Sequence, residues 1–418
     1  MNIHQISFRL KRQIALFSGK LSAGLPKVVG RFIAEMVYGI NARGSVRLSE
    51  IARALEEDIP LIKTIDRLSE NLAREGLVNE IVDRVAAEGS ARIKDDTLLT
   101  IDPSDISKRY AKKMEYLATV RDGSTGELSD GYWTYQVIGA QNGEPETMPL
   151  YMSLYSQESP EFVGENEEIL KAVDSVCKHV KKRGVWVMDR GGDRENLLKP
   201  LLDRGLKFLI RLVGTRHLIY KGKAVSALNL ALSCRLDYMD RIAKEERGTE
   251  KMVRLEYGYR KVKLPGREEP LYMVVVKGFG EEPMMPITNV EMRKNRKVLW
   301  WAVESYMTRW RIEETVRFVK QSYDLEDIRV LRYERLKNMM GFVLASAYFA
   351  AVHLGMKSKH QILARHAMNL SRRIFGIPDF RFYALADGIR ELLMKAGKGI
   401  STCLYQDHPD PQSDLFAT

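Results

Sequence analysis

Apolar residues recur every three or four positions along the first part of the chain, a spacing that is typical of helices. Residues 1–90 are therefore predicted to be wholly helical. Gly44 and Ser45 interrupt the pattern and separate two helical segments. Beyond them, Ser49 is placed to cap one short helix, and Pro60 suits the first turn of the next.

These two short helices and the tight turn between them resemble a helix-turn-helix. In that arrangement Lys63, Thr64 and Arg67 would be free to face a groove of DNA. The alternative is an ordinary pair of antiparallel helices, because an αα-hairpin carries the same pattern of apolar positions. The pattern alone leaves both interpretations open.

After residue 95 the pattern changes to short runs of β-branched and apolar residues, which predict strands. Three such strands, a helix over 166–182 and two further strands follow one another. This is the order of the ribonuclease H-like fold, so we predict an α/β protein with a mixed-sheet core that begins in residues 95–213. The predicted strands span residues 96–102, 132–140, 148–155, 185–188 and 208–212.

The next interval, residues 214–295, is not needed by that minimal core. Runs of β-forming residues over 252–264 and 271–279 predict a β-rich insertion. The insertion contains no tryptophan. Its other aromatic residues are expected to be core side chains, and they include Tyr257, Tyr259, Tyr272 and Phe279.

Helical patterns return in the last third of the chain. Residues 296–355 are expected to complete the core, and the stretch 336–354 is so uniformly apolar that it must be buried. Residues 356–418 are predicted to form a helical C-terminal region that ends in a disordered tail of about 15 residues. Its basic residues include Arg365, Arg372 and Arg373.

Two aspartates follow predicted strands of the core. Asp102 precedes Pro103, which is expected to stop the first strand, and Asp189 follows the strand over 185–188. Strand ends of an α/β sheet are where catalytic groups collect. The alternative for Asp102 is an Asx turn that closes the strand. Asp105 is a second candidate for the aspartate of this strand. Asp193 is expected to cap the helix that follows it.

The segment 306–320 places polar residues on one narrow face of a predicted helix. Tyr306, Arg309, Glu313 and Lys320 share that face. Trp301, Ile312, Val316 and Val319 form an adjoining apolar seam, which would dock the helix on a core. One interpretation is a solvated i,i+4 ion pair between Arg309 and Glu313, worth a few tenths of a kcal/mol. The other is a functional stripe that faces a ligand.

Composition and charge favour a nucleic acid among the partners that such a stripe could face. The 418 residues carry a formal charge of +11, which favours a polyanion. The first 34 residues hold six Lys or Arg and no acid, so they predict a basic arm for DNA or a frayed helix. Three isolated cysteines indicate neither a disulfide framework nor a zinc site. We find no apolar run long enough for a membrane span.

The spacing Y-x2-R-x3-E-x6-K at 306–320 resembles the signature of a large group of bacterial insertion-sequence DDE transposases. The D-R-G-G sequence at 189–192 is similar to the second-aspartate motif of the same group. The resemblance implies that Asp102, Asp189 and Glu313 are catalytic and hold two Mg²⁺ ions, with Mn²⁺ also supporting activity. It also implies that Tyr306, Arg309 and Lys320 contact DNA phosphates, and Lys63 and Arg67 are the candidates for DNA binding in the helical region.

The expected activity is metal-dependent DNA cleavage at the ends of an insertion sequence, with transfer of the 3′-hydroxyl to target DNA. The expected partners are double-stranded DNA and a second copy of the chain, with no membrane and no small-molecule substrate, in the cytoplasm at the nucleoid. One alternative is a nuclease on the same core, and another is a non-catalytic DNA-binding remnant. A recombinase with a covalent tyrosine is disfavoured, because Tyr306 lacks an Arg-His-Arg set around it.

Overall fold

The computed structural model describes most of the chain, with the exceptions of both ends and a few short internal segments. The predicted disordered tail and the basic residues Arg372 and Arg373 lie outside the described residues. The described ranges are 3–123, 125–246, 249–356, 360–371, 381–397 and 399–404.

The core is a mixed sheet in the strand order of the ribonuclease H-like fold. Its central strands follow one another as β4, β3, β1, β5 and β6. β1 is antiparallel to β3 and parallel to β5, which is parallel to β6. The predicted fold class is confirmed. The strands are β1 (Leu98–Ser107), β2 (Ala118–Arg121), β3 (Leu128–Ala140), β4 (Thr147–Tyr155), β5 (Val185–Met188) and β6 (Lys207–Arg211).

The prediction that Pro103 ends the first strand is wrong. β1 continues to Ser107, and Pro103 pairs with Tyr135 of β3. On its other side β1 pairs with β5 only from Leu98 to Thr100. A proline lacks the N–H that a ladder needs on both sides, so it is tolerated where one side of the strand has no partner.

The two faces of this sheet pack against different helices because side chains alternate along each strand. Trp186 faces the cluster that contains the helices α6 (Glu165–Val180) and α7 (Glu195–Asp203). Val185 and Val187 face the opposite cluster, which contains α9 (Arg296–Thr308). The buried, apolar β5 thus lies between two helical layers, as a parallel strand does.

Four strands of the insertion extend the core sheet, whereas β7 and β8 form a separate two-stranded sheet. β12 pairs with β6, and the order continues through β11 and β10 to β9, which gives a sheet of ten strands. Tyr257 and Tyr272 are buried in it. Its elements are β7 (His217–Tyr220), β8 (Lys223–Ser226), α8 (Ala227–Leu232), β9 (Tyr238–Glu246), β10 (Thr249–Val262), β11 (Leu271–Lys277) and β12 (Pro286–Thr288).

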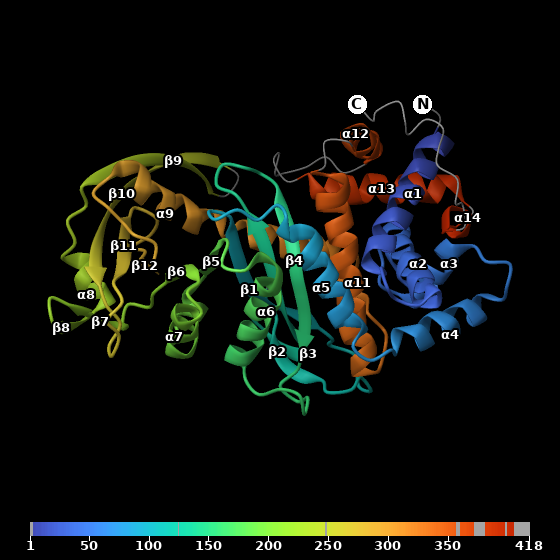
Figure 1. Cartoon of the computed structure of the whole chain (residues 1–418), viewed down its shortest axis with the longest axis horizontal. Coiled ribbons are helices and arrows are strands. Elements are labelled where there is room, and N and C mark those ends of the chain that lie inside the picture. The colour runs from blue at the N-terminus through green and yellow to red at the C-terminus, as the bar shows by residue number, and fades with distance from the viewer. Residues whose placement is uncertain are drawn as a thin grey trace.

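The N-terminal helices lie at the end of the molecule opposite to this insertion (Figure 1). Leu48, preceded by the cap residue Arg47, begins the short helix α3, so the prediction that Ser49 caps it is wrong. Pro60 is the residue before α4, close to its predicted place. The helices are α1 (Ile3–Leu21), α2 (Lys27–Arg43), α3 (Leu48–Leu55), α4 (Leu61–Leu72) and α5 (Leu77–Ser90).

α11 stands between these N-terminal helices and the sheet, and it contacts both β4 and α5 (Figure 1). Its apolar stretch is buried as predicted. In the part of the chain that the structure describes, no helix is long and apolar enough to cross a membrane. The last elements are α10 (Arg311–Ser322), η2 (Leu325–Asp327), α11 (Tyr333–Tyr348), the π-helical η3 (Phe349–Leu354), α12 (Gln361–Leu370), α13 (Phe382–Ala396) and α14 (Ser401–Leu404).

Candidate active site

The two predicted aspartates come from adjacent strands. Asp102 lies on β1 just beyond the residues that pair with β5, and Asp189 directly follows the last residue of β5. The Oδ1 atom of Asp189 accepts a hydrogen bond of 2.7 Å from the backbone N–H of Gly191, which fixes the carboxylate at the start of a short 3-10 turn. The parallel pairing of the two strands therefore brings both side chains to the same edge of the sheet.

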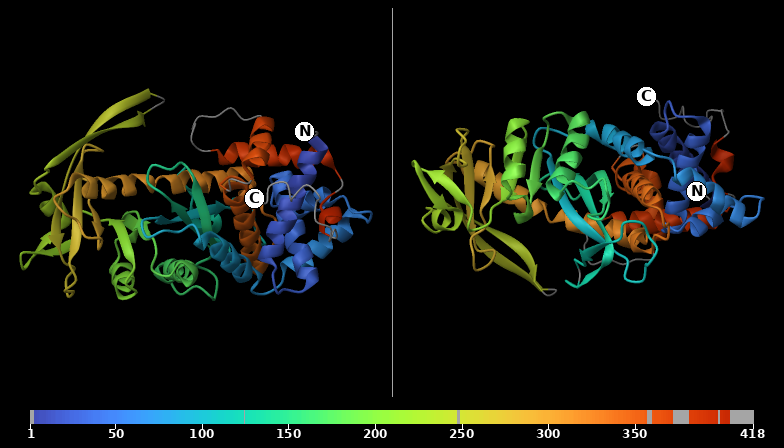
Figure 2. Two further views of the ribbon diagram at one scale, coloured as in Figure 1. Left: turned by 45° about the horizontal axis from the view of Figure 1, so that its top comes forward. Right: turned by 90° about the horizontal axis from the view of Figure 1, so that it is seen from below.

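The segment 306–320 is not one continuous helix, in contrast to the prediction. α9 ends at Thr308 and α10 begins at Arg311. Between them the backbone bonds run from residue i to residue i+3, as from Trp310 N–H to Met307 C=O and from Glu313 N–H to Trp310 C=O. This tighter winding turns the helix at the junction, so a single helical wheel places the side chains incorrectly. α9 and α10 still follow one another along the length of the molecule (Figure 2).

Arg309 lies at this junction among the predicted catalytic carboxylates. Its guanidinium group is 3.1 Å from Oε1 of Glu313 and 3.9 Å from Oδ1 of Asp102. It also lies 5.8 Å from the centre of the Tyr306 ring. Burial lowers the pKa of Arg309, but attraction to Tyr306 and to the carboxylates, Asp189 among them, outweighs burial and raises it. Arg309 is thus a buried cation that faces all three acids.

Asp102 is the most perturbed of the three acids. Burial raises the pKa of Asp102 to about 7, and the nearby charges of Asp189 and Glu313 add to this effect, while Arg309 opposes it. The side chain of Glu313 is 53% exposed, in contrast to 19% for Asp102. The charges of the other two acids thus act on Asp102, although the three carboxylates come from three separate parts of the chain.

Lys320 and Tyr306 occupy different surroundings from those that the stripe implies. Nζ of Lys320 lies 3.1 Å from Oδ1 of Asp105 and 3.4 Å from Oε1 of Glu326. Tyr306 is only 1% exposed, so it lies beneath Arg309 and not on the surface expected for a phosphate contact. The stripe therefore consists of one buried ring, two paired cations and one exposed acid.

A cavity of about 860 Å³ opens beside these residues. Its lining includes Asp102, Glu313 and Lys320, and it continues toward the acids around η2. Asp105 is nearly buried there, and its Oδ1 also accepts a hydrogen bond from the backbone N–H of Gly123. The cavity thus begins at the predicted catalytic edge, and half of the residues that line it are acids.

The donor set suits a hard divalent cation, because Asp102, Asp189 and Glu313 all offer carboxylate oxygens and little else. In the structure, however, the charge among them is balanced by Arg309. Across the described ranges, no group of three or more His, Cys, Asp or Glu side chains is arranged to hold a metal ion. The residues fit the chemistry of Mg²⁺, whereas their present arrangement centres on a guanidinium group.

The predicted DNA-binding residues of the helical region differ in their exposure. Lys63 is exposed on α4. Arg67 is held by Glu35 at 2.6 Å and by Glu57 at 2.8 Å. Thr64 is buried and donates a hydrogen bond to Glu57, so the expectation that it faces a groove is wrong.

The prediction that Asp193 caps the helix after it is wrong. Arg194 precedes α7, and Asp193 is buried with Oδ1 2.7 Å from Nε of Arg216. Its Oδ2 accepts a hydrogen bond from the backbone N–H of Val213. Asp193 therefore connects the end of β5 to the start of the insertion.

Sequence reasoning missed Trp310, which lies inside the signature spacing. Its side chain is partly exposed and meets Phe279 of the insertion edge-to-face at 5.5 Å. Phe279 is half-buried and packs at the edge of the second hydrophobic cluster. The signal that could have identified it is its place in the motif, directly after Arg309.

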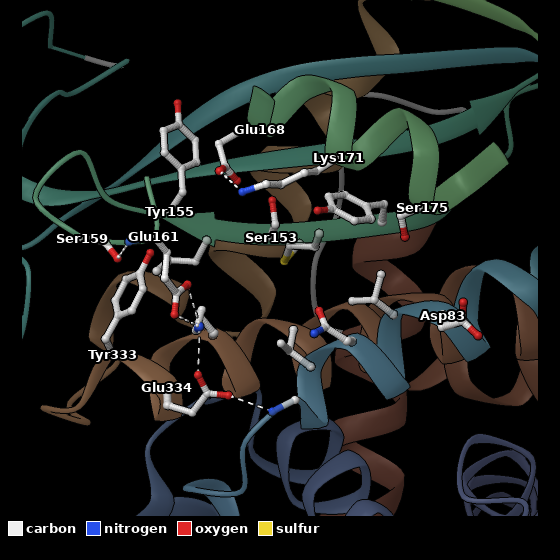
Figure 3. A pocket seen from close by; sticks show the side chains of 18 of the residues that line it. Asp83, Ser153, Tyr155, Ser159, Glu161, Glu168, Lys171, Ser175, Tyr333 and Glu334 are labelled. Atoms are coloured by element: carbon white, nitrogen blue, oxygen red, sulfur yellow. Dashed lines mark hydrogen bonds and ion pairs between the residues drawn. The ribbon is translucent and has the colours of Figure 1, made fainter. Parts of the chain in front are cut away.

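A further cavity, of about 930 Å³, lies apart from the carboxylates, between α5, β4, α6 and α11 (Figure 3). Its lysines are paired with acids, as Lys171 is with Glu168 and Lys337 with Glu161 and Glu334. Because its cations are already neutralised and acids predominate in its lining, this cavity offers no anion site.

Comparison with known proteins now bears on this arrangement. Residues 159–349 match the family described as the transposase DDE domain. The resemblance to DDE transposases is confirmed. The matched segment contains Asp189, Arg309, Glu313 and Lys320, whereas Asp102 precedes it. Among solved structures, the chain is similar to a cryo-EM structure of the piggyBac transposase synaptic complex with hairpin DNA. That similarity has a TM-score of 0.46 and 10% identity, and it covers 98% of this chain and 82% of the other.

Among curated proteins, none matches this chain significantly.

Proposed function

We propose that this protein is a DNA transposase that cleaves the ends of an insertion sequence and joins the freed 3′-hydroxyl to target DNA. One observation carries the proposal: Arg309 lies 3.9 Å from Oδ1 of Asp102 and 3.1 Å from Oε1 of Glu313. Asp189, Arg309 and Glu313 stand in the segment that matches transposase DDE domains. Three carboxylates at the edge of a ribonuclease H-like sheet are suited to phosphoryl transfer, which depends mostly on positioning and on charge.

Asp102, Asp189 and Glu313 would hold the divalent ions, which we propose to be two Mg²⁺ ions, with Mn²⁺ as a substitute. When bound, such ions stabilise the charge that develops on the attacking and leaving oxygens of an in-line displacement. Two of these carboxylates come from the adjacent strands β1 and β5, and α10 supplies the third, which supports this assignment. The exposed position of Glu313 leaves the DNA side of the site open.

Arg309 and Lys320 would then contact phosphates on either side of the scissile bond. Both are cations at the mouth of the 860 Å³ cavity or beside it. Tyr306 supports the guanidinium group from below, so its contribution to DNA contact is through Arg309. In the helical region, exposed Lys63 would add a phosphate contact that positions the DNA without reading its sequence. Arg67 would contact DNA only at the expense of its present ion pairs.

We further propose that two copies assemble when two DNA ends are brought together, and that the enzyme acts in the cytoplasm on nucleoid DNA. The helical N-terminal region (1–90) would bind the DNA ends. The catalytic core (95–213 and 296–355), its β-rich insertion (214–295) and the C-terminal region (356–418) would hold the scissile positions. These divisions are the ones predicted from the sequence, and the order of helices and strands along the chain supports them.

A cleavage assay tests this function. The purified protein is incubated with Mg²⁺ or Mn²⁺ and DNA that carries the sequences flanking its coding region, beside the variants Asp189→Asn and Asp174→Asn. Asp174 is a suitable control because it is an exposed acid on α6 that pairs with Arg204. We expect nicks at a defined terminus with the wild type and the control, and none with Asp189→Asn. Binding without cleavage would indicate a DNA-binding remnant, and cleavage that survives Asp189→Asn would refute the site.

A further inference from the structure

We infer that Arg309 is an exchangeable counter-ion, which competes with divalent metal for Asp102 and Glu313 and gives way when a DNA phosphate binds it. This inference rests on the proposed function, because it takes those carboxylates to be metal ligands. It adds a coupling between metal and DNA that neither the signature spacing nor the strand order implies.

The first support is that Arg309 uses the same oxygens that a metal would use. Its guanidinium group lies 3.1 Å from Oε1 of Glu313 and 3.9 Å from Oδ1 of Asp102. A divalent ion on those carboxylates would stand within a few ångströms of a fixed positive charge. In a partly buried site this repulsion is much stronger than between two solvated charges, because the effective dielectric constant is lower. The two cations therefore cannot share the carboxylates without a strong penalty.

The second support is that Arg309 is held loosely for a buried arginine. The contact with Asp102 is beyond hydrogen-bond distance, at 3.9 Å. Nε is buried and finds no hydrogen-bond partner among the residues that the structure describes. A guanidinium group offers five donors in a fork that matches a phosphate, so an incompletely bonded arginine gains by exchanging its partners for one.

The third support is the position of Arg309 in the chain. It stands in the tightly wound junction between α9 and α10, outside the regular part of either helix. Trp310, the next residue, is 42% exposed, so the junction lies at the surface. A small change at such a junction re-aims the side chain without unfolding a helix. The guanidinium group can thus turn toward solvent while Glu313 remains on α10.

Lys320 provides a contrast on the same helix. It pairs with Asp105, which is buried on β1 and is not one of the proposed metal ligands. Metal binding therefore does not require Lys320 to leave its partner. Of the two cations Arg309 and Lys320, only Arg309 has to leave its carboxylate partners when a metal ion binds.

Reciprocal coupling follows from this competition. A phosphate that draws Arg309 away frees the carboxylates and strengthens metal binding, and by linkage the metal strengthens DNA binding to the same extent. In the absence of DNA the site would hold metal weakly. The enzyme would then assemble its reactive site only on DNA, which limits unwanted hydrolysis.

Mn²⁺ binding to the full-length protein, measured by electron paramagnetic resonance of the free ion, tests the inference without relying on activity. The variants are Arg309→Gln and the control Arg317→Gln, which removes an exposed cation of α10 that pairs with Glu314. Without DNA, we expect Arg309→Gln to bind Mn²⁺ at least about tenfold more tightly than the wild type. The control should stay within about twofold, because a solvated charge is well screened. Equal affinities for Arg309→Gln and the wild type would overturn the inference.

A second arm adds a duplex with the sequences that flank the coding region. The duplex should tighten Mn²⁺ binding at least about fivefold in the wild type and much less in Arg309→Gln. If Arg309→Gln does not fold, the wild type alone remains decisive, because Mn²⁺ affinity that is unchanged by the duplex contradicts the coupling.

Asp102→Asn separates the proposed carboxylate site from the coupling through Arg309. Loss of Mn²⁺ binding in that variant supports the carboxylate site, and unchanged binding overturns the site and, with it, the inference.

Discussion

Lys320 on α10 reaches the core strand β1, where its Nζ lies 3.1 Å from Oδ1 of the buried Asp105. Asp105 in turn accepts a hydrogen bond from the backbone N–H of Gly123, in the connection between β2 and β3. One carboxylate therefore ties the signature helix to two parts of the core. A buried acid of this kind depends on its cation, because an unpaired buried charge is strongly unfavourable.

Lys320→Met should therefore destabilise the fold, by about 1–3 kcal/mol in the free energy of unfolding. The double variant Lys320→Met with Asp105→Asn should recover part of that loss, because the amide needs no counter-ion. Urea denaturation of the two single variants and the double variant measures the coupling. Strictly additive losses would show that the contact between Lys320 and Asp105 contributes nothing.

Arg67 is expected to be a structural residue whose effect depends on pH. Burial raises the pKa of Glu57, but hydrogen bonds from Arg67 and Thr64 and the charge of Arg67 outweigh burial and lower it. A lowered carboxyl pKa contributes stability above the unfolded value of 4.5, and this stability is lost as the pH falls through the folded value. Arg67→Met should thus lower the melting temperature clearly at pH 7 and much less at pH 3. A difference that is the same at both pH values would contradict this account.

Lys63 should behave in the opposite way, because it is exposed on α4. Lys63→Ala should leave the melting temperature unchanged and weaken DNA binding. If Lys63 contacts one phosphate, the slope of log affinity against log salt concentration should become shallower by about 1. Fluorescence anisotropy with labelled duplex at several salt concentrations measures that slope. An unchanged slope would remove Lys63 from the DNA interface and favour the αα-hairpin interpretation of α3 and α4.

Much of the fold follows from periodicity, and the exceptions have local causes. Alternation and apolar runs predicted β3, β4, β5 and β6 because each of those strands is bounded by turn residues. β1 was cut short at Pro103, since sequence does not reveal that the strand has a partner on only one side there. The pairing of β12 with β6 also depends on contacts between distant segments, which no local pattern encodes.

The sequence named the members of the candidate site but did not indicate their arrangement. Asp102, Asp189 and Glu313 were named from strand ends and from a signature spacing. The place of Arg309 among them was not predictable, because it depends on the i to i+3 winding at Trp310. A helical wheel assumes constant winding, so it assigned Tyr306 to the surface although the ring is buried. Motifs and the family resemblance therefore name the candidate residues, and tertiary packing decides which of them face one another.

Joining of DNA strands tests the central claim most directly. A duplex with an exposed 3′-hydroxyl at the element's terminus is incubated with a plasmid target, Mg²⁺ and the wild type, Glu313→Gln or Glu314→Gln. Glu314 is the neighbouring acid, which pairs with Arg317 on α10. We predict joined products with the wild type and Glu314→Gln, and at least about a hundredfold fewer with folded Glu313→Gln, because the site loses one carboxylate. Equal joining by both variants, or cleavage by the wild type with no joining at all, would contradict the account.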